Sequence, residues 1–442
     1  MQLRWAKGFT VAVLAASVAA TAGCGGGTGG TGGSGAKSGT LTLWHMEQPP
    51  NRVKAFQAVI DRYNATNPPL KVEQQVQDWN QIYTKIAGAV QSQTQPDILF
   101  TIPDFTTYVR PLGAVQPVTD VVKQADAEHH LIAAAKAPYL DKGQYWAVPL
   151  YGMVQMLWYR KDLFAKAGIN KAPQTWDELE ADAKALTKDG RSGIALPAGK
   201  NLATDQVLYS LMLTNGAGQF FSKDGSVALN QDKTAETVAF YKRLMQYSPK
   251  DSANYSWGEP QAAFNSGAAA MAIEKGQYLA PFEAESGRPA SDLGCAFIPK
   301  PAGGQDGSIY YSNAAMVMSK DSTRAAAAKA FLTWLLKPEN YGDFLDAEPG
   351  LFLPLTEDGM KASSWVSNPV IKKYAGCVNA MLEQSKSGAL FGFTNGQYNE
   401  SIGKISGQNV LAQVVQRATV QGEDPKTSVA WAQTQMQQAV QK

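Results

Sequence analysis

Aromatic and hydrogen-bonding side chains stand next to each other at three places in the sequence. These places are residues 44–47 (Trp-His-Met-Glu), 78–80 (Asp-Trp-Asn) and 103–105 (Pro-Asp-Phe). An aromatic ring packs on the apolar C–H face of a sugar, and neighbouring carboxylates and amides form hydrogen bonds with its hydroxyl groups. The pattern therefore indicates non-covalent recognition of a hydroxyl-rich ligand.

Motifs that would indicate catalysis are missing from the sequence. It contains no G-x-S-x-G, H-E-x-x-H or C-x-x-C, and no phosphate-binding or dinucleotide-binding glycine loop follows an expected strand. His129 and His130 follow an acidic helix and are expected on a solvated face rather than around a metal. We expect no catalytic residue, no metal and no cofactor. The sequence does not exclude a pair of carboxylates that hydrolyses glycosides, because the two residues need only be close in space.

The charge balance excludes large classes of partners. The 442 residues contain 40 Lys and Arg against 38 Asp and Glu, and removal of Arg4 and Lys7 with the expected signal segment leaves 38 against 38. A chain with no basic excess is not expected to bind nucleic acid or an anionic membrane surface. With 44% hydrophobic and 18% charged residues, the composition is that of a globular protein with large cores.

The amino-terminal segment is typical of an exported, lipid-anchored bacterial protein. Two basic residues precede residues 8–20, an apolar run too short to span a bilayer as a permanent helix. Residues 21–24 (Thr-Ala-Gly-Cys) resemble a lipobox, although Thr21 replaces the usual Leu. We expect cleavage of a signal peptide, residues 1–23, and acylation of Cys24. An ordinary secretory signal with an incidental cysteine is the alternative.

Residues 24–39 consist of that cysteine and a Gly-rich tether to the first expected strand. A flexible segment of this length has a reach of about 20 Å. It would hold a folded domain away from a membrane to which acyl chains anchor it. The expected location is therefore the outer face of the bacterial cytoplasmic membrane.

The elements that must position the three polar clusters alternate between strand and helix. Residues 40–45, 70–76 and 96–100 have the composition of strands, whereas residues 51–63 and 78–90 have apolar faces of helical period. This order predicts a parallel sheet. The carboxyl ends of parallel strands meet at one edge, which is where open α/β sheets bind ligands.

Residues 144–164 predict a connection between two compact units. They are too apolar for a loop, and Pro149 and Gly152 interrupt them, so they are not typical of a membrane span. We interpret them as a strand that leaves one unit, kinks between Pro149 and Gly152, and enters a second unit. The groove between two such units is a common place for a ligand.

Two cysteines, Cys295 and Cys377, remain in the mature chain. An exported protein forms disulfides readily. Two cysteines in so large a core are equally typical of small buried hydrophobic residues. The sequence leaves both alternatives open.

Several segments in a fixed order carry a family resemblance. The main ones are LTLWH (41–45), PDILF (96–100), YWAVPLYGMVQMLWYRKDLFAKAGI (145–169), NYSWGEPQAAFNSGAAAMAI (254–273) and FLTWLLKPENYGDFL (331–345). From Leu41 to about Phe352, the chain resembles the extracellular solute-binding proteins of carbohydrate ABC importers, the maltose-binding-protein-like group. Each segment alone would match many unrelated proteins. Their order and spacing along the chain together make the resemblance specific.

The resemblance implies a two-lobed α/β fold of the periplasmic-binding-protein type (type II), with a mixed or parallel sheet flanked by helices in each lobe. The implied lobes are residues 40–150 plus 308–352 and residues 151–307 plus 353–442, with crossings near 148–154, 304–311 and 350–356. The family has no enzymatic activity and delivers its ligand to a membrane permease powered by a separate ATPase. We expect a monomer that meets the membrane only through its lipid.

The resemblance also implies a set of ligand-binding residues. They are His45, Glu47, Gln48, Trp79, Asn80, Asp104, Phe105, Tyr151, Met153, Lys200, Asn201, Trp257, Gln277, Tyr278, Asn313, Phe352 and Phe393. The maltose-binding members have a ligand-binding carboxylate where Met153 stands, and a large aromatic residue where this chain has only Gln277 and Tyr278. The expected ligand is therefore a neutral oligosaccharide other than maltose. The alternatives are the same fold binding a polyamine or small organic ion, and a secreted glycan-processing enzyme.

Overall fold

A computed structural model describes residues 39–229, 232–394 and 397–441 of the chain. The expected signal peptide, Cys24 and all of the expected tether except Gly39 lie outside these residues. Within the described ranges, no helix is both long and apolar enough to cross a membrane.

The larger sheet contains the parallel strands that the sequence pattern predicts. Its order is β11–β10–β3–β1–β2, and β6 pairs with β10. The strands are β1 (Thr40–His45), β2 (Lys71–Val76), β3 (Ile98–Thr101), β6 (Val148–Val154), β10 (Ser308–Val317) and β11 (Gly388–Ala389). β1 runs parallel to β2 and β3, whereas β10 runs antiparallel to β3 and β6. The carboxyl ends of β1, β2 and β3 therefore share one edge.

The connecting helices follow from the apolar spacing of the sequence. α1 (Pro50–Ala65) begins with a proline, which suits the first turn of a helix because that turn needs no backbone donor. Its buried residues Phe56, Val59, Ile60 and Tyr63 recur at helical spacing and form one face. α2 (Ile82–Gln91) likewise links β2 to β3.

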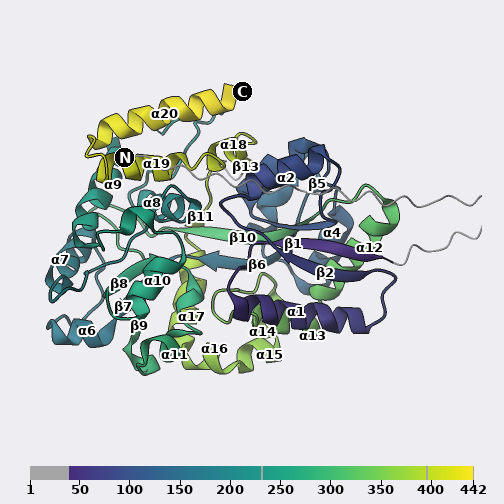
Figure 1. Ribbon diagram of the computed structural model, residues 1–442, viewed down its shortest axis with the longest axis horizontal. Helices are drawn as coiled ribbons and strands as arrows, with labels where there is room; N and C mark the ends of the chain where they lie inside the picture. Colours follow the sequence, from purple (N-terminus) through teal and green to yellow (C-terminus); the bar gives the residue numbers. More distant parts are fainter. Residues whose placement is uncertain (1–38, 230–231, 395–396, 442) are drawn as a thin grey trace, which may run out of the picture. The chain divides into compact units, whose positions relative to one another are not determined.

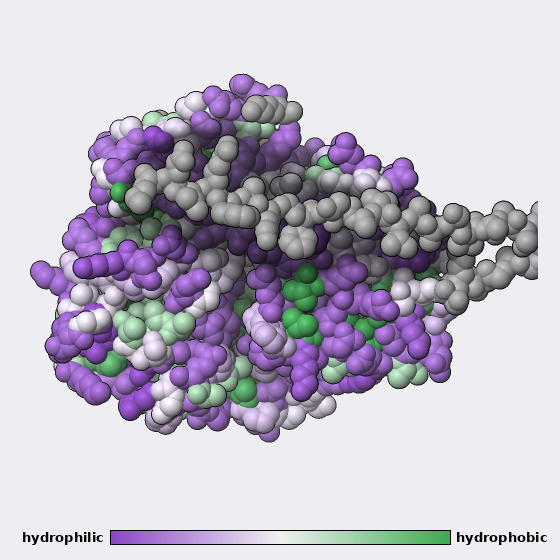
Figure 2. All heavy atoms as spheres, viewed as in Figure 1, coloured by the Kyte–Doolittle hydropathy of each residue, from purple (hydrophilic) through white to green (hydrophobic). Residues whose placement is uncertain are grey.

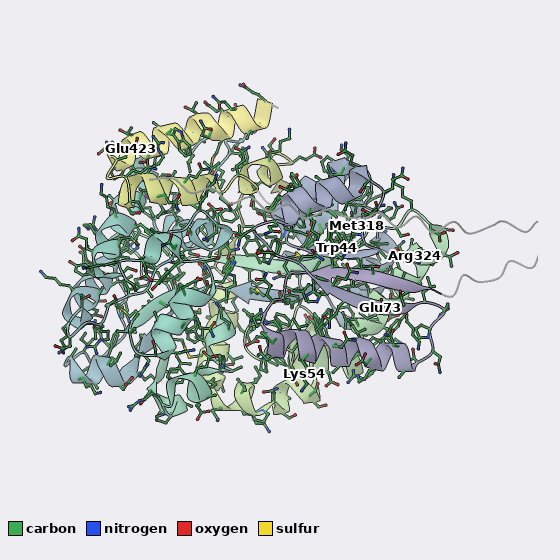
Figure 3. The ribbon with its side chains drawn as sticks, in the orientation of Figure 1. Trp44, Lys54, Glu73, Met318, Arg324 and Glu423 are labelled. Atoms are coloured by element: carbon green, nitrogen blue, oxygen red, sulfur yellow. A yellow bond between two sulfur atoms is a disulfide. The ribbon has the colours of Figure 1, made fainter. Side chains whose placement is uncertain are left out.

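Charged side chains fasten the amino ends of these strands. Arg324 of α12 (Ser322–Leu335) is labelled in Figure 3. It donates from Nε to Asp97 Oδ1 at 2.7 Å and from Nη2 to Thr40 O at 2.7 Å. The second oxygen of Asp97 accepts from the backbone N–H of Thr42 at 2.8 Å. The amino edge is thus closed by a structural ion pair, and the carboxyl edge is left for other roles.

The predicted crossing stretch joins the larger sheet to a smaller one. β6 passes into β7 (Met156–Arg160) with only Gln155 between them. β7 pairs antiparallel with β8 (Met271–Glu274) and β9 (Leu293–Ala296). Figure 1 shows β6 and β10 between β1 and β2 on one side and the β7–β9 strands on the other. The crossing strand inferred from residues 144–164 is therefore present.

Helices surround both sheets. Those before β10 are α3 (Pro103–Val109), α4 (Thr119–His129), α5 (Ala133–Lys136), α6 (Lys161–Lys166), α7 (Trp176–Leu186), α8 (Leu202–Thr214), α9 (Asp232–Leu244), α10 (Gly258–Asn265) and α11 (Phe282–Ser286). Those after α12 are α13 (Pro338–Leu345), α14 (Glu357–Lys361), α15 (Ser363–Ser367), α16 (Pro369–Lys373), α17 (Ala375–Ser385), α18 (Ile402–Ser406), α19 (Val410–Thr419) and α20 (Pro425–Gln441). Two short hairpins, β4–β5 (Leu140–Asp141 and Gln144–Tyr145) and β12–β13 (Phe393–Thr394 and Gln397–Tyr398), lie outside the two sheets. α18 packs on α3 and α19 packs on α8, so the carboxyl-terminal segment contacts helices that flank both sheets.

The surface and the core are sharply separated. On the face shown in Figure 2, hydrophilic side chains dominate and hydrophobic ones form small patches. Among the described residues, the exposed large hydrophobic side chains are Val76, Leu140, Val366 and Val420. They come from separate elements, which is ordinary for a folded protein and marks no docking face.

Two details go beyond the sequence analysis. Residues 194–196 form only one bridge, between Ala195 and Ala272. The reason is that Ile194 N–H donates to Tyr247 O, and Pro197 has no N–H with which to extend the pairing. The two cysteines left open by the sequence form a disulfide, Cys295–Cys377, which links β9 to α17.

Candidate ligand-binding site

A cavity of about 370 Å³ opens at the carboxyl edge of the larger sheet. Its lining residues come from the loops after β1 and β2, from the first turn of α1, from β6 and β10, from the beginnings of α3, α8 and α10, from the turn after β8, and from the segment after α13. The polar and charged members are Glu47, Gln48, Arg52, Gln206, Gln261, Lys275, Gln277 and Asn313. The others are Met46, Pro49, Trp79, Ile102, Met153, Leu202, Trp257, Gly258 and Leu351. A mainly apolar wall with a few polar groups is the usual composition of a small-molecule site.

An ion-pair cluster forms one wall of the cavity. Arg52 Nη1 lies 2.5 Å from Glu47 Oε2, and Arg52 Nε lies 3.2 Å from Glu348 Oε2. Burial opposes the charge of Arg52, but the two carboxylates outweigh it and raise the pKa of the guanidinium. Burial also raises the pKa of Glu348, against the opposing effect of Arg52. The positive charge of Arg52 is therefore already neutralised inside the protein.

Tyr151 supports this wall from behind. Its hydroxyl donates to Glu47 Oε1 at 2.7 Å, and its ring stacks on Phe352 with centroids 3.9 Å apart. Burial, followed by the nearby Glu47 carboxylate, raises the pKa of Tyr151 well above its usual value, so the hydroxyl keeps its proton. Tyr151 and Phe352 are each only 2% exposed and do not line the cavity. Their role in the structure is to orient Glu47.

A second buried cation lies on the wall formed by the smaller sheet. Lys275 Nζ lies 4.1 Å from the ring centroid of Trp257 and 3.2 Å from Glu274 Oε1. Burial lowers the pKa of Lys275, while Glu274 opposes that effect. The ammonium group is thus held by a carboxylate and an aromatic face together.

The turn that presents Lys275 and Gln277 touches the third crossing directly. A Cβ added to Gly276 would lie 2.0 Å from the carbonyl oxygen of Gly350. Gly350 itself has a φ of +91°, which residues with a side chain rarely adopt. The turn and the crossing segment therefore meet backbone against backbone.

Three cavity-lining amides lack protein partners. Gln206 Oε1, Gln277 Oε1 and Asn313 Nδ2 are buried and have no hydrogen-bond partner among the residues that the structure describes. Leaving such a group unpaired costs about 1–3 kcal/mol each. Two are acceptors and one is a donor, so the group that satisfies them must both donate and accept hydrogen bonds.

Two tryptophans contribute aromatic faces to the cavity. Trp79 lies in the loop after β2 and packs edge-on against the fully buried Phe105, with centroids 5.8 Å apart. Trp257 lies just before α10, on the Lys275 side. Phe105 therefore acts as a support that fixes the orientation of Trp79.

The structure brings seven of the predicted site residues together on the cavity wall. They are Glu47, Gln48, Trp79, Met153, Trp257, Gln277 and Asn313. The other ten do not line it: His45, Asn80, Asp104, Phe105, Tyr151, Lys200, Asn201, Tyr278, Phe352 and Phe393. Some of these ten, such as Tyr151 and Phe105, contact a lining residue from the side away from the cavity. Others have partners elsewhere in the protein.

Three of the residues that do not line the cavity, His45, Asn201 and Tyr278, contact other parts of the protein instead. His45 is fully buried, with Nε2 2.7 Å from Gln74 Oε1 and its ring against Phe56. Asn201 caps α8 by accepting from the backbone N–H of Thr204. Tyr278 is fully buried and its ring stacks on Trp158 at 5.5 Å.

Asp104 belongs to a buried acidic pair beside the cavity. It is fully buried and accepts from Ser406 Oγ of α18, and burial raises its pKa to about 6. Asp205 of α8 accepts from Asn409 Nδ2 at 2.7 Å and from Ala412 N–H at 2.6 Å, and burial raises its pKa to about 7. The two carboxyls anchor the carboxyl-terminal segment to α3 and to α8.

Sequence reasoning missed the two lining cations and two of the amides, namely Arg52, Lys275, Gln206 and Gln261. Arg52 lies in the first turn of α1, directly after the loop that follows β1. This position next to a predicted ligand-binding loop could have identified Arg52 as a site residue. Gln206 lies one turn after the cap of α8, inside a helix whose residues are all buried. A polar residue near the start of a mainly apolar helix could have identified Gln206 in the same way.

Comparisons with known proteins agree with this architecture. The family described as bacterial extracellular solute-binding protein matches residues 49–342. The putative ABC transporter periplasmic-binding protein YcjN of Escherichia coli K12 is 22% identical over 409 residues, which cover 91% of this chain and 93% of YcjN.

Solved structures share the fold at low identity. A solute-binding protein of Agrobacterium radiobacter K84 in complex with ribitol superposes with a TM-score of 0.77 at 21% identity, covering 91% of this chain and 98% of that one. Maltose-bound MalE3 of T. maritima gives a TM-score of 0.77 at 15% identity, covering 90% and 99%. The fold is therefore the two-lobed fold of these binding proteins. With the family match spanning residues 49–342, the chain belongs to the bacterial extracellular solute-binding protein family.

Proposed function

We propose that this protein is the substrate-binding component of an ABC importer and captures a neutral oligosaccharide in the cavity. The observation that carries the proposal is the set of three unpartnered amides, Gln206, Gln277 and Asn313, in the same cavity as two tryptophans. A sugar hydroxyl both donates and accepts, so it satisfies either kind of amide atom. The faces of Trp79 and Trp257 suit the C–H faces of sugar rings.

The charges of the wall favour a neutral ligand. Arg52 is paired with two carboxylates and Lys275 with one. An ionic ligand would have to compete with these buried pairs, and breaking such a pair is strongly destabilising. A hydroxyl instead adds a hydrogen bond to Glu47, Arg52 or Lys275 without removing an existing partner.

The cavity disfavours both alternatives considered from the sequence. A polyamine needs several carboxylates, yet Glu47 is the single acidic residue among the lining residues, and Arg52 and Lys275 repel cations. A glycosidase needs two facing carboxyl groups. The described lining supplies only one, because Asp104 lies behind the wall.

The remaining parts of the proposal concern delivery. The protein would be held at the outer face of the cytoplasmic membrane by acyl chains on Cys24, as a monomer, after removal of a signal peptide. It would present its ligand to the transmembrane subunits of a permease powered by a separate ATPase. The family match and the relatives' bound maltose and ribitol support this role.

Thermal unfolding with a ligand panel tests the proposal. A ligand that binds only the folded state raises the unfolding temperature by mass action. We expect upward shifts with at least one neutral sugar and none with polyamines, amino acids or metal ions. Shifts with a polyamine but with no sugar would reject the proposal. Release of new saccharide products during incubation would favour the enzyme alternative.

A further inference from the structure

One part of the cavity wall is aliphatic rather than aromatic. Ile102, Met153 and Leu202, which we call the apolar floor, line the cavity and are 3%, 9% and 6% exposed. A sugar hydroxyl placed against these side chains would lose its water and find no partner there. A methyl group in the same place would gain from burial.

Asn313 lies within the apolar floor. On β10, Asn313 pairs with Tyr151 of β6, and the next residue, Ala314, pairs with Thr101 of β3. Ile102 follows Thr101, so it lies beside Asn313 on the β3 side. Met153 lies two residues beyond Tyr151, on the same face and diagonal to Asn313. On this face Asn313, whose Nδ2 donor is unpartnered within the described residues, therefore has Tyr151 directly opposite, Ile102 on its other side and Met153 on the diagonal.

Gln206 borders the floor on the opposite element. It lies four residues after Leu202 on α8, so the two side chains share one helix face. Gln206 is 3% exposed, and its Oε1 acceptor has no partner within the described ranges. The floor is therefore bordered by one free donor from β10 and one free acceptor from α8.

We infer that the ligand carries an acetamido group that seats on the apolar floor. Its methyl group packs on Ile102, Met153 and Leu202. Its N–H donates to Gln206 Oε1, and its carbonyl oxygen accepts from Asn313 Nδ2. The inference rests on the proposed function and narrows it, from neutral sugars in general to N-acetylated sugars.

Other substituents match the floor less completely. A hydroxyl brings no apolar surface to the three side chains. The methyl group of a deoxy sugar packs on the floor but itself offers neither a donor to Gln206 nor an acceptor to Asn313. An unacetylated amino sugar brings a cation towards Arg52 and Lys275. A secondary amide with a methyl group supplies donor, acceptor and apolar contact together.

Matched sugar pairs test the inference on the mature protein. N-acetylglucosamine, N-acetylgalactosamine and N-acetylmannosamine would be compared with glucose, galactose and mannose by calorimetry, as would the bis-acetamido analogue of cellobiose with cellobiose. Deoxy sugars and maltose would complete the panel. We expect the best acetylated sugar to bind at least about tenfold more tightly than its hydroxyl parent. If a hydroxyl-only or deoxy sugar binds as tightly as every acetylated one, the inference fails and the proposed function stands. If no sugar binds, both fail.

Near-isosteric variants give a second, independent test. Asn313→Leu and Gln206→Met should each weaken binding of the acetylated sugar more than binding of its hydroxyl parent, so that the preference for the acetylated sugar falls by about tenfold. Gln48→Met is the matched control, because Gln48 also lines the cavity but is exposed. An unchanged preference in both variants would overturn the inference.

Stability of the ligand-free variants adds a check that does not depend on binding. Both amide atoms are unpaired without ligand, so their apolar replacements should leave the unfolding temperature unchanged or raise it. A large decrease in either variant would show that the protein itself uses the amide, and would contradict the assignment.

Discussion

Replacing Asp205 by Asn should stabilise the protein in a strongly pH-dependent way. Burial raises the pKa of Asp205 from 3.8 to about 7. The folded state therefore holds a proton that the unfolded state releases between these two values. This contribution to stability is fully present below pH 3.8 and is lost as the pH rises through 7.

The magnitude follows from proton linkage. The raised pKa of Asp205 destabilises the folded state relative to the unfolded state by about 4 kcal/mol at pH 8, where the unfolded group is fully ionised, and by about 2 kcal/mol at pH 5. Asn carries no charge at either pH. The stability of Asp205→Asn relative to the native protein should therefore rise by about 2–3 kcal/mol from pH 5 to pH 8.

Urea unfolding of both proteins at the two pH values measures this difference. Asp205 accepts from Asn409 with Oδ2 and from Ala412 with Oδ1, and Asn replaces one of these two oxygens by an NH2 group. The loss of that acceptor is present at both pH values, so it cancels in the comparison. Asp61→Asn, at an exposed position of α1, controls for the substitution of a surface carboxyl. A gain below about 0.5 kcal/mol between pH 5 and pH 8 would refute the argument that burial keeps Asp205 protonated.

Further predictions concern the disulfide and the cavity walls. Replacing Cys295 and Cys377 by Ser should lower the free energy of unfolding by about 4 kcal/mol, since the bond closes a loop with a sequence separation of 82; a loss below 1 kcal/mol in urea unfolding would contradict the loop-entropy reasoning. Tyr151→Phe removes the donor to Glu47 Oε1 and should cost about 1.5–3 kcal/mol of stability; equal unfolding midpoints would show that Glu47 does not need it. Trp79→Ala should weaken sugar binding by about 1–3 kcal/mol in calorimetry; unchanged affinity would remove Trp79 from the site.

Sequence periodicity predicted the sheet well because each element carried its own local signal. The run of residues 96–100 is uniformly buried once folded, as a strand in the middle of a sheet requires. The crossing at residues 144–164 was visible because apolar strand residues continue through Pro149 and Gly152. The sequence could not decide whether Cys295 and Cys377 form a disulfide, because bond formation depends on the distance between the two residues in space. Their separation in sequence does not give that distance.

The site was predicted less completely because a position after a strand does not fix the direction of a side chain. α3 begins at Pro103, so Asp104 and Phe105 already belong to a helix and turn into the core. Asn313 and Met153, which the family resemblance implied, lie on β10 and β6 and do line the cavity. Lys275 could not be recognised as a wall residue, because its position depends on Trp257 and Glu274 being brought together by folding.

The backbone contact between Gly276 and Gly350 defines a criterion for searching other genomes. A side chain at either position would separate the ligand-facing turn from the crossing segment, whatever the ligand. The lining residues, in contrast, are free to change with the ligand that each protein takes. Proteins that keep both glycines but differ at Asn313 and Gln206 would therefore share this cavity architecture while recognising different substituents.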